Sequence, residues 1–366
     1  MNHKGRMATS IFKKEIPDKV PHGDCMIWPQ IHDKILGEST FENTEKINYL
    51  EYWMSENFDN HFFERDLKTR NFLGFDWTHV FPTEHWQIID RDKDSFIKKD
   101  PYGVEWKVTS DSLSMYKSPI KSLSDMKNYK APSLDQFSFK NLGKWINDSD
   151  LFTFVQIDSG VFKLYQIIGF DKFMIEVMDN KNKLIGLNEK LCEFQISLAK
   201  EAIRKGADCI WLSDDHCGFD SSFLSPSQMW ELDFQFQKKI VDEVHRLGCP
   251  CIMHSCGNLN NTIELMVSTG IDGIMGIQPT ANNDIESYKR KYGKKVTFIG
   301  NICVSKLMPY GKPWDVDLAV KDLIKKIGFD GGLVVSTCNA LLNDQPIENV
   351  ITMHLAVEKY GHYPVV

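Results

Sequence analysis

The sequence has no long hydrophobic run: it lacks any stretch of about 18 consecutive apolar residues, the length that a membrane-spanning helix needs. Its first residues also lack the apolar core of a secretion signal. The chain has no run of more than three basic residues, and 43 Lys and Arg residues against 50 Asp and Glu residues give a net charge of −7. This balance disfavours nucleic acids and anionic membranes as partners, because both are bound through a positive field.

Other signatures are absent as well. No Gly-x-Gly-x-x-Gly follows a predicted strand, and no glycine-rich loop carries the lysine of a phosphate-binding motif. We find no serine nucleophile elbow and no carboxylate pair with glycosidase spacing. Cysteines are few, 9 in 366 residues, and their odd number predicts reduced thiols in a cytoplasmic protein instead of a disulfide framework.

The composition changes along the chain. Residues 1–20 are polar, and we expect a flexible N-terminal arm there. Residues 21–366 are predicted to form a single domain, in which 30–150 contains insertions rich in aromatic and charged residues. We interpret these insertions as a possible lid or substrate pocket. Within them, the tetrapeptide at 100–103 (DPYG) predicts a turn between two strands.

From about residue 150, short apolar runs alternate with amphipathic stretches, which is the pattern of parallel βα units. With two further strands upstream, the total of eight predicts an α/β fold, a (β/α)8 barrel of the TIM type with N-terminal additions. An open, doubly wound sheet is the alternative. The predicted strands cover 23–28, 77–81, 153–158, 209–214, 250–255, 273–278, 296–301 and 333–338. The predicted helices cover 226–247, 259–269, 284–292, 315–327 and 347–360.

Thiol and imidazole side chains gather where the predicted strands end, and in such a barrel these ends surround the active site. His254 and Cys256 are two residues apart, so their side chains point to the same face of a strand. With Cys338 at the end of another strand, they predict a zinc site of three protein ligands and one open position. In the alternative interpretation, His254 and Cys256 only fill the core. Cys217 and Cys303 are possible substitutes for Cys338.

Two adjacent carboxylates, Asp214 and Asp215, follow a predicted strand. We predict a catalytic role for them, as a metal ligand, a general base or a group that orients His254; a helix cap or an exposed pair is the alternative. Further polar residues at the strand ends are predicted to bind substrate: Asp158, His216, Asn258, Gln278 and Asn301.

Several of these phrases resemble the uroporphyrinogen decarboxylase superfamily. The resemblance is clear from about 150 to 362 and weaker before that. It rests on IWLSDDHCG at 210–218, LSP at 224–226, MHSCGN at 253–258, FIGNI at 298–302 and DQPIENV at 344–350.

The resemblance implies a (β/α)8 barrel and one of two chemistries. The metal-free decarboxylases grip substrate carboxylates with an arginine-rich N-terminal segment, whereas Arg6, Arg65 and Arg70 are the only arginines in the first 90 residues here. The other branch contains zinc-dependent, corrinoid-linked methyltransferases, similar to the methylcobamide:coenzyme M enzymes of methanogens.

In that second branch a His-x-Cys pair and a distant Cys hold zinc, and His254, Cys256 and Cys338 match these positions. Cobalamin-independent methionine synthase uses a related set with a Glu. Here the comparable residue is Gln278, so Asp214, Asp215 and the substrate are all candidates for the fourth ligand.

The resemblance therefore predicts a zinc-dependent methyltransferase that moves a methyl group between a corrinoid protein and a small thiol or other methylated compound. Methylcobalamin would be carried by a separate protein, because the chain has no recognisable corrinoid domain. A metal-free lyase acting on a carboxylated substrate is the second hypothesis. A non-catalytic protein that binds a small thiol or a corrinoid partner is the third.

Overall fold

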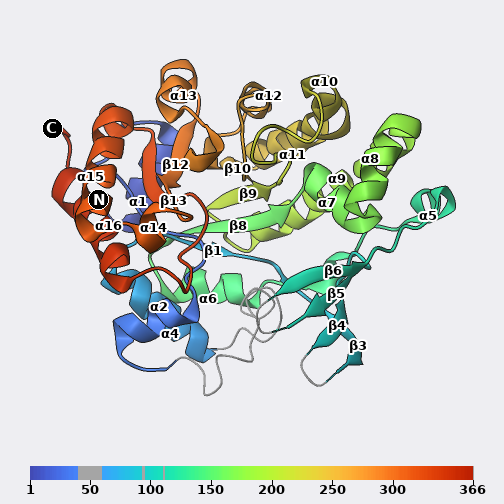
Figure 1. The fold of residues 1–366 in the computed structure, drawn as a ribbon, viewed down its shortest axis with the longest axis horizontal. Coiled ribbons are helices and arrows are strands. Elements are labelled where there is room, and N and C mark those ends of the chain that lie inside the picture. Colours follow the sequence, from blue (N-terminus) through green and yellow to red (C-terminus); the bar gives the residue numbers. More distant parts are fainter. Residues whose placement is uncertain (40–59, 93–94, 110–111, 366) are drawn as a thin grey trace.

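Seven parallel strands form the central sheet of the protein. The computed structural model describes residues 1–39, 60–92, 95–109 and 112–365. Each strand pairs in parallel with the next, in the order β1-β8-β9-β10-β11-β12-β13, and the sheet curls into a barrel (Figure 1). The predicted α/β barrel fold is confirmed. The strands are β1 (Trp77–Val80), β8 (Phe152–Asp158), β9 (Cys209–Ser213), β10 (Cys251–Ser255), β11 (Gly273–Gly276), β12 (Thr297–Ile302) and β13 (Leu333–Thr337).

The predicted strand over 23–28 is wrong. Within this range Ile27 forms only an isolated parallel bridge, to Leu341, and His22 just before it forms another to β13. The carbonyl oxygen of His22 accepts the N–H of Asp76, next to β1, at 2.8 Å. Asp24 interrupts a regular ladder, because its buried carboxylate accepts both the hydroxyl (2.6 Å) and the N–H (3.3 Å) of Thr337. An irregular segment therefore occupies the place between β13 and β1.

Helices cover the outer face of the barrel (Figure 1). The predicted helix over 347–360 is confirmed as α16 (Ile347–Tyr360), and the stretch 226–247 is helical with a π-helical turn, η4 (Trp230–Phe234), inside it. The other outer helical segments are α6 (Lys140–Asp148), α7 (Gly160–Ile168), α8 (Phe170–Asp179), α9 (Lys181–Arg204), α10 (Pro226–Met229), α11 (Gln235–Arg246), α12 (Ile263–Ser268), η5 (Pro279–Ala281), α13 (Ile285–Tyr292), α14 (Leu307–Tyr310), α15 (Pro313–Leu323) and η6 (Ile324–Gly328).

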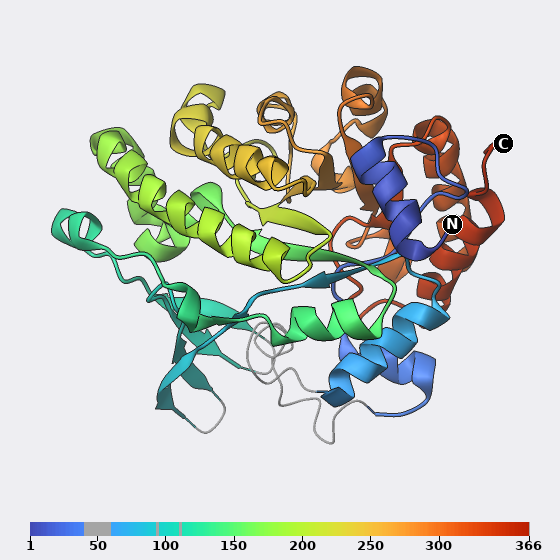
Figure 2. The same ribbon diagram turned by 180° about the vertical axis from the view of Figure 1, so that it is seen from behind.

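The N-terminal residues are ordered, so the expected flexible arm over 1–20 is wrong. They form α1 (His3–Ala8) and a π-helical turn, η1 (Thr9–Lys13), which lie against the barrel in Figure 2. Met7 and Ile11 lie four residues apart on one helical face, and both are fully buried in the cluster of inward side chains from the strands. At the start of β12, the hydroxyl of Thr297 donates to the carbonyl of Ser10 at 2.7 Å. The helical turns thus cover the end of the barrel where its strands begin.

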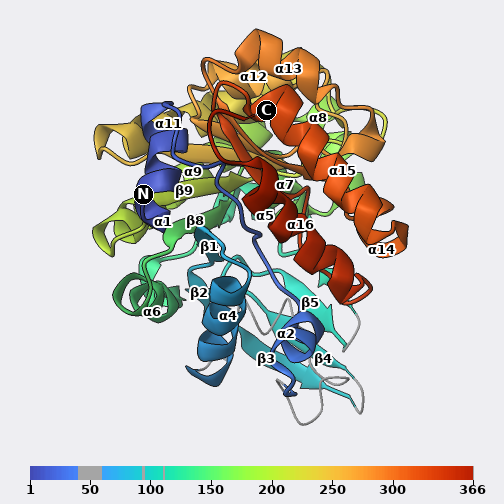
Figure 3. The same ribbon diagram turned by 90° about the vertical axis from the view of Figure 1, so that its left-hand side faces the viewer.

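The aromatic region between β1 and β8 builds a separate antiparallel sheet, β3-β4-β5-β6. The predicted turn at 100–103 joins β4 to β5 and is confirmed by the hydrogen bond from the N–H of Asp100 to the carbonyl of Val104. Figure 3 shows this sheet with α2 and α4 on one side of the barrel, opposite α12 and α13. Residues 40–59 of the predicted insertion lie outside the described residues. The elements are α2 (Pro29–Leu36), α4 (Asn60–Phe72), β2 (Thr83–Glu84), β3 (Gln87–Arg91), β4 (Phe96–Lys99), β5 (Glu105–Val108), β6 (Leu113–Lys117), α5 (Leu123–Asn128), η3 (Leu134–Gln136) and β7 (Phe137–Ser138).

Among the described helices, none combines the length and the apolar character needed to cross a membrane.

Candidate active site

The strand register places a row of side chains at the C-terminal ends of four neighbouring strands. Asp158 is the partner of Ser213, Ser213 is the partner of His254, and His254 is the partner of Met275. Partners on adjacent strands point to the same side of a sheet, and here that side is the barrel interior. All four residues line one cavity of about 510 Å³. Trp211, two residues before Ser213, also faces inward and forms part of the cavity wall.

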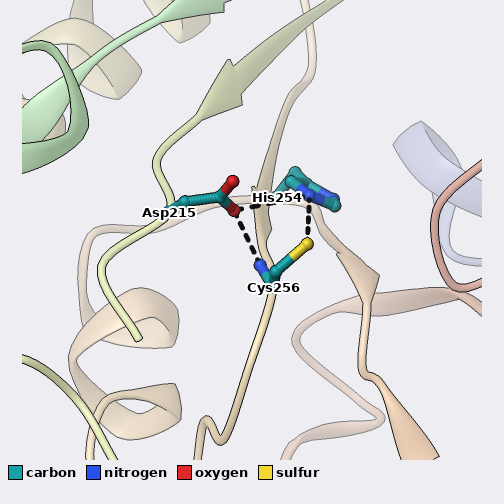
Figure 4. A group of neighbouring side chains, drawn as sticks. All are labelled: Asp215, His254 and Cys256. Carbon is teal, nitrogen blue, oxygen red and sulfur yellow. Dashed lines mark hydrogen bonds and ion pairs between the residues drawn. The ribbon is translucent and has the colours of Figure 1, made fainter. Parts of the chain in front are cut away.

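Three possible metal-binding side chains meet at the edge of this cavity: Asp215 and His254, which line it, and Cys256 beside them. The sulfur of Cys256 lies 3.5 Å from Nε2 of His254, and Oδ1 of Asp215 lies 3.7 Å from the same nitrogen. Oδ1 of Asp215 also accepts the backbone N–H of Cys256 at 2.9 Å, which ties the loop after β9 to the loop after β10 (Figure 4). The three ligand atoms all lie within 4.8 Å of one another. The structure therefore brings together two of the three predicted zinc ligands and one of the two predicted catalytic carboxylates.

The imidazole of His254 is oriented for coordination through Nε2. Its Nδ1 lies 2.9 Å from the thioether sulfur of Met275, which can only accept a hydrogen bond. Nδ1 therefore carries the proton, and Nε2 of the neutral ring presents its lone pair to Cys256 and Asp215. Burial lowers the pKa of His254, which favours this neutral form.

The thiol of Cys256 is held in a mostly apolar place. Burial, followed by the charge of Asp215, raises its pKa, so without a nearby cation the thiol stays protonated. The amide of Asn339 donates to its sulfur at 3.5 Å. Cys338 does not join the close group of donors, although its charge contributes to the raised pKa of Cys256. Burial raises the pKa of Cys338 itself to about 12.

Asp214 faces away from the cavity, so that of the two carboxylates predicted to be catalytic only Asp215 lines it. It follows Ser213 by one residue, and successive side chains point to opposite faces of a strand. Its carboxylate is fully buried, bonds His216 at 3.0 Å, and accepts N–H groups from Phe162 at 2.9 Å and Gln237 at 2.8 Å. Because Phe162 lies in the first turn of α7, Asp214 acts as a cap for that helix, the alternative interpretation of this pair.

The predicted substrate-binding residues separate into two groups. Asp158 lines the cavity, whereas His216 belongs to the buried network of Asp214. The other three are not among the cavity-lining residues and bond neighbouring loops instead. Oδ1 of Asn258 accepts the N–H of Asn260, Oε1 of Gln278 accepts the N–H of Gly257, and Nδ2 of Asn301 donates to the carbonyl of Ile277.

The possible substitutes for Cys338 are engaged elsewhere. The sulfur of Cys217 lies 3.5 Å from the hydroxyl of Thr262, and that of Cys303 lies 3.6 Å from the hydroxyl of Ser305. Neither residue belongs to the donor group at the cavity.

Sequence reasoning missed the charged and aromatic residues that the region before β8 adds to the same cavity. Glu84, Trp86, Asp100 and Trp106 line it together with Lys163 of α7. No motif marks the first four, which lie far from the barrel motifs in sequence. The only available signal was the high aromatic and charge content of the segment.

The fold and this site define an α/β-barrel protein with a cluster of nitrogen, sulfur and oxygen donors at the C-terminal ends of its strands. The chain belongs to the uroporphyrinogen decarboxylase (URO-D) family, whose sequence pattern matches residues 94–360. The resemblance noted in the sequence is thereby confirmed.

Similar proteins fall in both chemical branches of the family. Methylcobamide:CoM methyltransferase MtbA of Methanosarcina acetivorans is 26% identical over 208 residues, which span 56% of this chain and 57% of the relative. Uroporphyrinogen decarboxylase of Coxiella burnetii is 23% identical over 286 residues, 72% of this chain and 74% of the relative. A solved methyltransferase from Methanosarcina mazei has the same fold, with a TM-score of 0.74, 16% identity, and coverage of 98% of this chain and 99% of that chain. The relatives thus include enzymes of the methyltransferase kind.

Proposed function

We propose that this protein is a zinc-dependent methyltransferase that moves a methyl group between a corrinoid, carried by a separate protein, and a small thiol or another methylated compound. The observation that carries the proposal is the meeting of Asp215, His254 and Cys256, two of which line the cavity. The similarity to relatives named methylcobamide:CoM methyltransferase supports the same reaction class.

The donor atoms suit zinc. A tetrahedral zinc with Zn–N of about 2.0–2.1 Å and Zn–S of about 2.3 Å separates its nitrogen and sulfur ligands by about 3.6 Å. The observed distance between Nε2 of His254 and the sulfur of Cys256 is 3.5 Å. The raised pKa of the Cys256 thiol also means that it needs a cation to become a thiolate ligand. His254 and Cys256 would hold the ion together with Cys338, which lies outside the close group of donors, and Asp215 or the substrate would be the fourth ligand.

Bound zinc would lower the pKa of a substrate thiol, or polarise the leaving group of a methylated compound in the reverse direction. The protein's own side chains prepare the site. Met275 fixes the tautomer of His254, Asp215 fixes the backbone of Cys256, and Asn339 donates to the sulfur of Cys256. In the transfer to a thiol, the S–C bond forms as the C–Co bond breaks. Both electrons of the broken bond stay on cobalt, and the thiol proton leaves to solvent.

The cavity gives little support to the metal-free decarboxylase hypothesis. A substrate with several carboxylates needs cationic side chains, but among the described cavity-lining residues Lys163 is the only lysine and no arginine is present. Carboxylates prevail there instead. The match to the decarboxylases therefore supports the shared fold more than a shared substrate.

Metal analysis of the purified protein tests the proposal. We expect about one zinc per chain, with a loss or strong weakening in His254→Ala, Cys256→Ala and Cys338→Ser. Cys249→Ser is the matched control, because Cys249 is a buried thiol just before the other end of β10. Methyl transfer from methylcobalamin to a panel of thiols should depend on Cys256. Full transfer by a folded Cys256→Ala, or no zinc after reconstitution under reducing conditions, would refute the proposal.

A further inference from the structure

A second group of charged residues lines the cavity away from the donor cluster. Nζ of Lys163 forms an ion pair of 3.1 Å with Asp158 and lies 4.2 Å from the ring centre of Tyr102. Glu84 and Asp100 add two more buried carboxyls beside this pair. Lys163 can balance only one carboxylate, so this part of the cavity has an excess of acidic groups.

Two indole rings accompany the two additional carboxyls. Nε1 of Trp86 donates to Oε2 of Glu84 at 2.6 Å, and Nε1 of Trp106 donates to Oδ2 of Asp100 at 2.9 Å. The rings are stacked, with centroids 6.1 Å apart and an interplanar angle of 28°, and both line the cavity. Aromatic faces attract organic cations, most strongly where water is excluded. The carboxyls and the rings thus favour the same kind of ligand.

Buried polar atoms in the cavity wall also lack partners. Oε1 of Gln166 and Nε1 of Trp211 have no hydrogen-bond partner within the described part of the chain, and both side chains are more than nine-tenths buried. Both residues line the cavity. A buried polar atom without a hydrogen bond costs free energy. The position of these two atoms in the cavity wall points to a bound molecule that forms the missing hydrogen bonds.

We propose that the substrate of this enzyme carries a positively charged ammonium group, which binds in the cavity against the Glu84 and Asp100 carboxyls and the Trp86 and Trp106 rings, while its reacting end lies at the donor cluster. The identity of the reacting end rests on the methyl transfer proposed above. A cavity of about 510 Å³ is far larger than a metal ion but suits a small organic molecule that reaches both groups.

The same geometry disfavours an anionic thiol such as coenzyme M, after which the relative MtbA, a methylcobamide:CoM methyltransferase, is named. A sulfonate would need an unpaired cation, but Lys163 is engaged with Asp158. No arginine lines the cavity in the described ranges, and the stretches outside them contain none in their sequence. A sulfonate in this place would lie beside several carboxyl groups with no unpaired cation among the described lining residues to balance its charge.

Binding calorimetry with three thiols of similar shape tests the inference. The probes are 2-(trimethylammonio)ethanethiol, its neutral analogue 3,3-dimethylbutane-1-thiol, and the anionic 2-mercaptoethanesulfonate. We expect the cationic thiol to bind at least about tenfold more tightly than the neutral one, and the sulfonate to bind most weakly. Equal or tighter binding of the sulfonate would overturn the inference.

Choline, which has no thiol, separates this inference from the proposed function. It should bind both zinc-loaded and metal-free protein. If the protein proves to bind no zinc, the affinity for choline therefore still tests the ammonium site. Glu84→Gln combined with Asp100→Asn should weaken choline at least about tenfold. Glu105→Gln is the matched control, because it removes the same charge from β5 but pairs with Lys117 outside the cavity. Unchanged choline binding in the double variant, with the near-ultraviolet spectrum of the indoles preserved, would refute the ammonium site.

Discussion

Binding of a cation at Glu84 should release a proton. Burial, followed by the charge of Asp100, raises the pKa of Glu84 to about 8, so the carboxyl is mostly neutral at pH 7 while the cavity is empty. The groups that act on it are Asp100 from the turn after β4, Lys163 from α7, Asp158 from the end of β8, and the indole N–H of Trp86. A cation favours the ionised form, and binding therefore drives the proton off.

The magnitude follows from that pKa. The ionised fraction of Glu84 is about 1% at pH 6, about 9% at pH 7 and about 50% at pH 8. If the cation binds only the ionised form, the Kd of choline falls about ninefold between pH 6 and 7 and about fivefold between pH 7 and 8. Close to 0.9 proton is released per cation bound at pH 7.

Calorimetry in buffers of different ionisation enthalpy measures this proton directly. Wild-type protein should show the release, and Glu84→Gln should lose most of it, together with most of the pH dependence between 6 and 8. Glu105→Gln should behave as wild type. An identical proton count in wild type and Glu84→Gln would show that this carboxyl does not titrate on binding, and the electrostatic reasoning about the cavity would be wrong.

Three further changes test the structural roles assigned above. Asp214→Asn removes a buried acceptor of several hydrogen bonds and should lower the free energy of unfolding by about 3 kcal/mol, measured by urea unfolding. Asp215→Asn should mainly weaken zinc binding, measured by metal titration. An equal loss of stability in the two variants would contradict the opposite orientations of the two side chains. Met7→Ala should cost about 2–4 kcal/mol of stability in urea unfolding with zinc content unchanged, and a cost near zero would mean that α1 is not packed in the barrel. Gly160→Ala should strongly destabilise the fold in thermal unfolding, because its φ is +60° and a Cβ would lie 2.3 Å from Oδ1 of Asp233; a wild-type melting temperature would contradict that close approach.

The barrel and the principal donors could be predicted from the sequence because their signals are local. Each apolar run of 4–7 residues marks a strand, and polar residues at its end mark the mouth of the barrel. His254 and Cys256 share a face as a direct result of their spacing. The orientation of Asp214 against Asp215 was not predictable in the same way, since it depends on the residue at which β9 ends.

The other side of the cavity could not be predicted because it arises from contacts between distant segments. Glu84 lies on β2, which pairs with β7, and Asp100 lies in the turn between β4 and β5; only the folding of these segments brings both carboxyls beside Asp158 and Lys163. Neither carboxyl belongs to a sequence motif, and a single sequence does not show which distant segments come into contact. The flexible-arm prediction failed for a related reason: Met7 and Ile11 are apolar residues in a polar stretch, and their partners lie on strands far along the chain.

The interior contacts of α1 also constrain the order of folding. Met7 and Ile11 pack in one cluster with Val334 of β13, and the segment at 21–23 bonds Val335 of the same strand. Part of this packing forms with β1 and β8, but it is complete only when β13, far along the chain, is also in place. Such long sequence separation slows folding and exposes apolar surface in the meantime. Closure of the barrel on this side therefore depends on contacts of high sequence separation, and we expect a fusion placed directly before α1 to interfere with it more than one placed in a surface loop.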